Sequence, residues 1–265
     1  MTARIEKPQQ PYDRDPAVLE AAALIRAGEL VAFPTETVYG LGADATNREA
    51  VDAIYRVKHR PPDNPAIIHI GHNEDILRIG VVEDPRILAL FKRFWPGALT
   101  MVIPALEPYR STVGRGLDTV AVRMPGHPIA LALIHAAGVP IAAPSANRSG
   151  RPSPTTAQHV FDDLGDMIPL ILDGGPCMVG IESTVVDLSQ GETRILRPGV
   201  ITAEAISQVL GRPVEVASAE DLARSPGTRH PHYRPRVPVV IVPRGATRDD
   251  IVKQIAALDT AAGKH

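Results

Sequence analysis

The stretch LVAFPTETVYGLGADATNREAVDAIYRVKHR at residues 30–60 contains the elements that decide the fold. Its first four residues form an apolar run that stops at Pro34, which predicts a short buried strand. Residues 47–58 then place aliphatic side chains on one face at helical spacing, and Asn47 precedes them as an N-cap. A buried strand followed by an amphipathic helix indicates an α/β protein.

Further helices and strands are predicted on both sides of this stretch from capping signals and apolar runs. The predicted helices span residues 16–27, 85–94, 128–137, 155–164, 203–210 and 247–261. The predicted strands span residues 66–70, 99–103, 118–123, 139–143, 168–172, 183–188, 193–196 and 237–242. Several strands follow one another without a helix between them, as mixed sheets require. We predict one main domain of the α/β (α+β) class, with a twisted sheet of parallel and antiparallel strands flanked by helices.

The composition narrows the class of protein. The 265 residues are 44% hydrophobic and carry a formal charge of −2, so broad electrostatic adhesion to nucleic acid is not expected. Cys177 is the only cysteine, which excludes a disulfide within the chain. The first residues are too polar for a signal peptide, and no apolar run reaches the length of a membrane span. We expect a soluble, cytoplasmic protein.

Polar motifs stand at the ends of the apolar runs, and they contain no nucleophile paired with a base. The motifs are PTETVYGLGADA at 34–45, KHRPPDNPAIIHI at 58–70, PSANRSG at 144–150, IESTVVDL at 181–188 and LRPGV at 196–200. Their Arg, Lys, Ser, Asn and His side chains suit anions and hydroxyl-bearing ligands. Such a site would act by positioning and charge compensation, which favours phosphate chemistry.

Basic residues close several of the predicted elements, beside Pro, Ser or Asn. These residues are Lys58, Arg60, Arg123, Arg148, Arg151 and Arg197. Each one alone is typical of a solvated surface charge. Because ligands of α/β proteins gather at strand ends, we expect these cations to converge on one anionic ligand.

Other short motifs have simpler interpretations. GLGADA at 40–45 fits a dinucleotide fingerprint, but PTETVY separates it from the preceding strand, so we predict that its glycines serve a tight turn. HIGH at 69–72 matches the ATP-binding tetrapeptide of class I aminoacyl-tRNA synthetases, but the lysine-rich loop that accompanies that motif is not found. The first residue of this tetrapeptide, His69, is therefore interpreted either as an ordinary strand histidine or as one that faces a ligand. No P-loop and no G-x-S-x-G motif is found.

Two further features are weak signals for chemistry. His230 and His232 have a metal-ligand spacing, but they lack a third clustered ligand, so a solvated linker is the better interpretation. Cys177 beside a glycine turn is interpreted as a small apolar filler. No metal site is predicted.

At the quoted motifs the chain resembles the threonylcarbamoyl-AMP synthases, the YrdC-like family. The paired K-x-R and S-x-N signatures correspond to Lys58-His59-Arg60 and Ser145-Ala146-Asn147. Supporting blocks are PTETVYGLG, NP-x-I-x-H-I, FWPG-x-LT, TVAVRMP, ESTVVD and RPG. The resemblance covers about residues 15–210. Ala66 and Ala98 depart from it, where Leu and Pro are common.

The end of the chain resembles only part of the longer family members. SPGTRHPHYRP at 225–235 is similar to the linker that precedes a Rossmann-like second domain in those members. About 30 residues remain after it, too few for that domain. We therefore expect a YrdC-like catalytic domain at 1–216, a linker or lid at 217–236, and a short βα remnant of the second domain at 237–265.

The resemblance implies an adenylyltransferase reaction. L-Threonine, bicarbonate and ATP would give L-threonylcarbamoyladenylate and pyrophosphate, with Mg²⁺ on the ATP phosphates and no tightly bound cofactor. Other tRNA-modification proteins would accept the product and modify the tRNA adenosine next to the anticodon. Neither stable nucleic-acid binding nor membrane association is expected of this chain.

The resemblance and the charge pattern together assign roles to residues. Lys58, Arg60, Ser145 and Asn147 are the expected catalytic residues and also bind ATP. Further expected ATP ligands are Thr119, Arg197, His232 and Tyr233, the last two from a lid at 225–235. The expected threonine ligands are Thr35, His69, Arg123 and Ser183, with Arg123 on the carboxylate.

Two other functions remain open from the sequence. One is an RNA-binding module whose basic motifs contact a phosphate backbone, although the net charge and the lack of interleaved aromatics disfavour it. The other is a related carbamoyl-transfer domain that uses carbamoyl phosphate.

Overall fold

The chain folds around one mixed sheet, in a computed structural model that describes residues 2–218 and 242–262. Its strands are β1 (Arg4–Glu6), β2 (Val31–Phe33), β3 (Gly40–Asp44), β4 (Ile67–His69), β5 (Leu99–Pro104), β6 (Thr119–Arg123), β7 (Ile141–Ala142), β8 (Leu170–Leu172), β9 (Thr184–Asp187), β10 (Arg194–Arg197) and β11 (Glu215–Val216). Their order in the sheet is β1-β8-β2-β3-β7-β4-β6-β5-β9-β10-β11. The sheet contains parallel pairs, such as β4 with β6, and antiparallel pairs, such as β5 with β6. This confirms the predicted mixed α/β fold.

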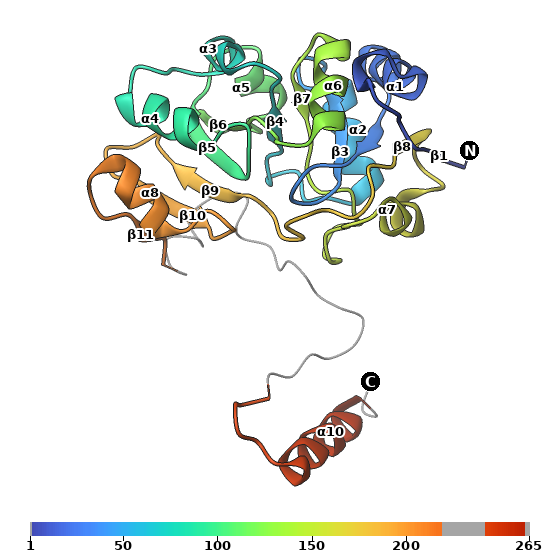
Figure 1. Cartoon of the computed structure of the whole chain (residues 1–265), viewed down its shortest axis with the longest axis vertical. Helices are drawn as coiled ribbons and strands as arrows, with labels where there is room; N and C mark the ends of the chain where they lie inside the picture. Colours follow the sequence, from blue (N-terminus) through green and yellow to red (C-terminus); the bar gives the residue numbers. More distant parts are fainter. Residues whose placement is uncertain (1, 219–241, 263–265) are drawn as a thin grey trace.

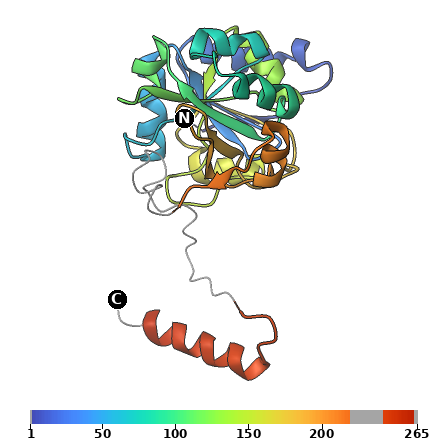
Figure 2. The same cartoon turned by 90° about the vertical axis from the view of Figure 1, so that its left-hand side faces the viewer.

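Helices lie on both faces of this sheet (Figures 1 and 2). They are α1 (Pro16–Arg26), α2 (Arg48–Lys58), α3 (Ile76–Ile79), α4 (Pro85–Phe94), α5 (Tyr109–Thr112), α6 (Pro128–Ala137), α7 (Ala157–Leu164) and α8 (Ala203–Leu210). The last described helix, α10 (Arg248–Ala262), is not part of these layers. Helices α1 and α6 pack on one face through a core that includes Phe33 and Leu133. A larger core, which includes Leu41 and Ile54, fills the other side. None of the helices among the described residues has the length and apolarity needed to cross a membrane.

Capping side chains begin the helices where the sequence predicts them. Asp15 accepts hydrogen bonds from the backbone N–H groups of Ala17 and Val18, and Asn47 accepts from Glu49 and Ala50. Such caps satisfy N–H groups that have no partner inside a helix. They also fix where α2 starts, and therefore that it ends at Lys58, beside the site described below.

The prediction of a glycine turn at GLGADA is wrong, because residues 40–44 form β3 in the middle of the sheet. The reason lies in packing. A Cβ atom on Gly42 would lie 2.8 Å from the Phe33 ring and 2.8 Å from the Ile141 side chain. The glycine lets both side chains pack against the bare backbone of β3. Strands β1 and β11 had no sequence signal that we used, and residues 237–241 of the predicted strand at 237–242 lie outside the described residues.

We expect Gly42→Ala to lower the free energy of unfolding by about 1–3 kcal/mol, because overpacking a rigid core forces neighbours out of place. Phe33 and Ile141 are both fully buried and have no free space to enter. Gly191→Ala is the matched control, since a Cβ atom there meets nothing within 4 Å, and its effect should stay within about 0.5 kcal/mol. Urea unfolding of the two variants tests this, and equal stabilities would contradict the packing role of Gly42.

Candidate functional site

A cavity of about 680 Å³ lies where several strand ends meet. It is lined by the end of α2 and by the loops around β2, β4, β6, β7, β9 and β10. The predicted site residues on its wall are Thr35, Lys58, Arg60, His69, Arg123, Ser145, Asn147, Ser183 and Arg197. Residues spread over more than half of the chain therefore share one site, as the strand-end argument predicted.

Strand pairing brings the polar side chains together. Strands β4 and β6 are parallel, and their register sets His69 directly beside Arg123. Strands β9 and β10 are antiparallel, so the end of β10 at Arg197 returns to the start of β9, next to Ser183. The guanidinium of Arg197 donates to the Ser183 backbone oxygen (3.1 Å) and to its hydroxyl (3.2 Å).

Lys58 connects the two signature motifs. Its side chain is 1% exposed, and its ammonium donates to the backbone oxygens of Ser145 and Asn147. Burial lowers the pKa of Lys58 well below its usual value, and the nearby Arg60 lowers it further. The last residue of α2 thus holds the S-x-N loop in place through neutral oxygens, with no carboxylate in contact.

The S-x-N loop is further fixed by its own side chains. The Ser145 hydroxyl donates to Oδ1 of Asn147 (2.5 Å), and Nδ2 of Asn147 donates to the backbone oxygens of Arg148 and Arg151, each at 2.8 Å. Both amide hydrogens of Asn147 therefore have acceptors. The loop presents a rigid polar wall to the cavity.

Arg60 leaves the helix by a sharp turn. His59 adopts the left-handed conformation (φ 51°) that ends α2, and Arg60 then donates to the backbone oxygens of Asn64 (2.9 Å) and Pro65 (3.0 Å). Burial lowers the pKa of Arg60 from its usual value. The guanidinium remains part of the cavity wall and supplies a fixed positive group there.

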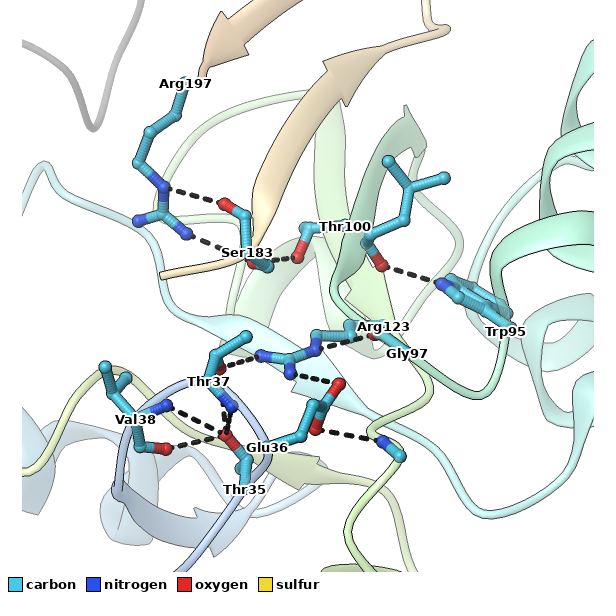
Figure 3. Close-up of polar contacts among 12 residues, drawn as sticks. Thr35, Glu36, Thr37, Val38, Trp95, Gly97, Thr100, Arg123, Ser183 and Arg197 are labelled. Carbon is cyan, nitrogen blue, oxygen red and sulfur yellow. Dashed lines mark hydrogen bonds and ion pairs between the residues drawn. The ribbon is translucent and has the colours of Figure 1, made fainter. Parts of the chain in front are cut away.

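Arg123 sits in a network of its own (Figure 3). It is 3% exposed and contacts the Glu36 carboxylate (2.7 Å), the Thr37 hydroxyl (2.9 Å) and the Gly97 backbone oxygen (3.1 Å). Glu36 and Thr37 were not predicted as partners of Arg123, although both lie in PTETVYG. The local sequence of a loop does not indicate a contact with a residue so far along the chain.

Thr35 organises the same loop. Its hydroxyl donates to the Val38 backbone oxygen (2.6 Å) and accepts from the backbone N–H groups of Thr37 and Val38, both at 3.2 Å (Figure 3). Thr35 therefore shapes the loop that holds Arg123.

His69 is neutral in this environment. Burial, reinforced by the positive charge of Arg123, lowers the pKa of His69 to about 3. The edge of its ring packs against Phe33 at a centroid distance of 6.0 Å. His69 lines the cavity from strand β4 and offers hydrogen bonding without charge; its role as a ligand-facing histidine stays a prediction.

Some predicted residues do not reach the described cavity. Thr119 lies on β6 but is absent from the cavity wall. Arg148 is also absent from that wall, and its side chain donates to the backbone oxygen of Asp163 (3.0 Å). Arg151 lines the cavity and pairs with the Asp163 carboxylate. His230, His232 and Tyr233 lie outside the described residues. Burial raises the pKa of Cys177 to about 11, which agrees with its interpretation as an inert filler.

No group of three or more His, Cys, Asp and Glu side chains suited to a metal is found in residues 2–218 and 242–262. Glu182 is the only carboxylate among the described residues that line the cavity. Magnesium bound to nucleotide phosphates needs at most one or two protein carboxylates. The wall therefore suits a magnesium ion that arrives with a nucleotide better than a resident metal.

Comparisons with known proteins identify the family that this chain resembles in sequence. The Sua5/YciO/YrdC family model, described as "Telomere recombination", matches residues 23–199, and a second model, described as the C-terminal domain of threonylcarbamoyl-AMP synthase, matches residues 201–264. The chain is similar to the threonylcarbamoyl-AMP synthase of Bacillus subtilis, with 50% identity over 235 residues, which is 86% of this chain and 67% of the relative. The corresponding protein of Pyrococcus abyssi is 49% identical over 244 residues, which is 89% of this chain and 71% of the relative.

A solved structure has the same fold. It is the Pyrococcus abyssi Sua5 protein complexed with L-threonine, with a TM-score of 0.88 and 43% identity. The superposition covers 98% of this chain and 78% of the other. Escherichia coli YciO, at 22% identity and a TM-score of 0.69, shares the fold.

We expect His69→Gln to make the free energy of unfolding less dependent on pH below about pH 6.5. Above pH 6.5 the ring is neutral in both states and contributes nothing; as the pH falls towards 3, the unfolded chain binds a proton that the folded chain does not. The free energy of unfolding then drops by up to about 1.4 kcal/mol per pH unit from this one group. Between pH 6 and 4 the free energy of unfolding of the variant should therefore depend on pH less steeply than that of the wild type, by the contribution of about one proton. Denaturant unfolding at each pH measures this difference. His159→Gln, an exposed change on α7, is the control, and parallel curves for wild type and His69→Gln would contradict the buried neutral ring.

Proposed function

This chain belongs to the threonylcarbamoyl-AMP synthase family, and we propose that its strand-end cavity is where L-threonine, bicarbonate and ATP react. The observation that carries the proposal is the meeting of both signature motifs, Arg123 and Arg197 on one cavity wall. The products are L-threonylcarbamoyladenylate and pyrophosphate, as the sequence predicted.

The threonine half of the site is assigned to Thr35, His69, Arg123 and Ser183. Arg123 supplies positive charge for the substrate carboxylate, and its contacts with Glu36 and Thr37 orient the guanidinium beforehand. The neutral ring of His69 lies beside it through the β4–β6 register. The similar Pyrococcus abyssi protein was solved in complex with L-threonine, which supports this amino acid as a ligand of the cavity.

The nucleotide half is assigned to Arg60, Arg197 and the S-x-N loop. Lys58 supports this half mainly by holding the loop, because its ammonium already donates to Ser145 and Asn147. Thr119 does not line the described cavity, so we propose for it at most a contact at the edge of the nucleotide half. The roles expected for His232 and Tyr233, in a lid at 225–235, stay a prediction, because these residues lie outside the described part of the chain.

The chemistry needs no protein nucleophile. The threonine amine and bicarbonate condense to a carbamate with loss of one water molecule. A carbamate oxygen then attacks the α-phosphorus of ATP and displaces pyrophosphate. Both partners are anions, so fixed cations offset their repulsion while the walls hold them in line. Arg60, Arg123 and Arg197 are buried or half-buried and anchored by hydrogen bonds, so little reorganisation is needed when charge develops.

Magnesium would be held by ATP and by water, with Glu182 as the candidate carboxylate from the chain. It would neutralise charge on the phosphates.

The wider role follows from the product. An adenylate is a reactive mixed anhydride, so a second protein must accept it for tRNA modification next to the anticodon, and a cytoplasmic location suits that role. The division into 1–216, 217–236 and 237–265 stays a proposal; the separate family match at 201–264 supports a distinct C-terminal region.

The rival functions make different demands. An RNA-binding module needs exposed cations, whereas Lys58 and Arg123 are 1% and 3% exposed. A carbamoyl-transfer domain would use carbamoyl phosphate as the source of the carbamoyl group. Both are separated from the synthase by one assay.

We expect wild-type protein with ATP and labelled bicarbonate to form an adenylate product only when L-threonine is present. The same incubation with ATP, and with carbamoyl phosphate in place of bicarbonate, should give none. RNA binding is measured in parallel between low and high salt, since phosphate contacts weaken steeply with salt. Threonine-independent product, or tight salt-dependent RNA binding without turnover, would contradict the proposal.

We expect Arg123→Lys to raise the KM for threonine by about 10- to 100-fold, because lysine keeps the charge but loses the planar fork of a charge-assisted pair. The KM for ATP should change by less than about twofold. Arg86→Lys is the matched control, since Arg86 pairs with Asp84 and binds the 190–191 loop away from the cavity. Steady-state kinetics decide, and a threonine KM equal to wild type would place the carboxylate elsewhere.

A further inference from the structure

Thr100 on β5 has a fully buried hydroxyl that no assigned role uses. The Oγ1 atom of Thr100 lies 2.7 Å from Oγ of Ser183 (Figure 3). Thr100 shares a face of β5 with Val102, which lines the cavity, but Thr100 itself does not. It stands directly behind a residue of the threonine half.

The direction of the Thr100–Ser183 hydrogen bond follows from counting donors. Each hydroxyl has one hydrogen and two lone pairs. If Ser183 donated to Thr100, the hydrogen of Thr100 would have no acceptor among the described residues, in a fully buried position. If Thr100 donates to Ser183, its hydrogen is satisfied.

Arg197 completes the count. Its guanidinium donates to the Ser183 hydroxyl at 3.2 Å and, being a guanidinium, can only donate. Thr100 and Arg197 together then fill both lone pairs of Ser183 Oγ. The hydroxyl hydrogen of Ser183 is left to point into the cavity that Ser183 lines.

We propose that Thr100 is a positioning residue that turns the hydroxyl proton of Ser183 towards an anionic oxygen of the threonine-derived substrate. The inference rests on the proposed function. The Ser183 hydroxyl then acts only as a hydrogen-bond donor towards the substrate. It donates to a carboxylate or carbamate oxygen and has no lone pair left to accept from the substrate amine or hydroxyl. Strand β5 thereby enters the site through hydrogen bonding.

The contacts around Thr100 suit this role. Strands β5 and β9 are parallel, with Thr100 in register with Val185, two residues after Ser183. The Trp95 ring donates to the Leu99 backbone oxygen at 2.7 Å and fixes the start of β5 (Figure 3). The hydroxyl of Thr100 therefore approaches Ser183 from a strand that is held at its end.

The test is a double-mutant cycle of Thr100→Val and Ser183→Ala, read by calorimetric binding of L-threonine and by KM values. Thr100→Val should weaken threonine binding by about three- to tenfold while the KM for ATP changes less than twofold. In the Ser183→Ala background the same change should cause no further loss, because the proton it directs is gone. Thr100→Ser, which keeps the hydroxyl, should restore wild-type affinity.

Thr112→Val is the matched control, since that buried hydroxyl donates to the Ala45 backbone oxygen away from the cavity. It should lower thermal stability and leave threonine binding unchanged. Additive losses in the cycle, a Thr100→Ser variant as weak as Thr100→Val, or equal losses for ATP and threonine would overturn the inference. Wild-type protein without threonine-dependent adenylate would instead show that the proposed function itself fails.

Discussion

The burial of a single ammonium group organises the site. A charge removed from water must find acceptors, and Lys58 finds them in the backbone oxygens of Ser145 and Asn147. Those residues lie 87 and 89 positions further along the chain, so the contact joins the end of α2 to the loop after β7. These backbone oxygens offset part of the desolvation that lowers the pKa of Lys58. The same two bonds fix the S-x-N loop against the end of α2.

Two arginines on the same cavity wall are anchored by different groups. Arg123 pairs with the Glu36 carboxylate and donates to the Thr37 hydroxyl, whereas Arg197 donates to the hydroxyl and backbone oxygen of Ser183. These contacts hold each guanidinium in one direction before any ligand arrives, so little reorganisation is needed on binding.

How far the sequence could lead depended on the range of each interaction. The caps Asp15 and Asn47 act over two or three residues, so α1 and α2 were predicted closely. Gly42 was misread because its partners, Phe33 and Ile141, come from other strands. The same limit hid the contacts of Glu36 with Arg123 and of Thr100 with Ser183. Charged residues and motifs could be identified from the sequence because their chemistry depends on residue type and local spacing. The residues that hold them in place could be identified only from the pairing of the strands.

The register of β4 and β6 has a consequence for folding. His69 and Arg123 face the cavity, while the residues just before them, Ile68 and Val122, are fully buried in the opposite direction. A slip of either strand by one residue would turn its polar side chain into the hydrocarbon core and its aliphatic one into the cavity. A misaligned sheet would thus carry a desolvation penalty at His69 and Arg123. The two residues that we propose as threonine ligands would therefore also favour the correct register of the sheet.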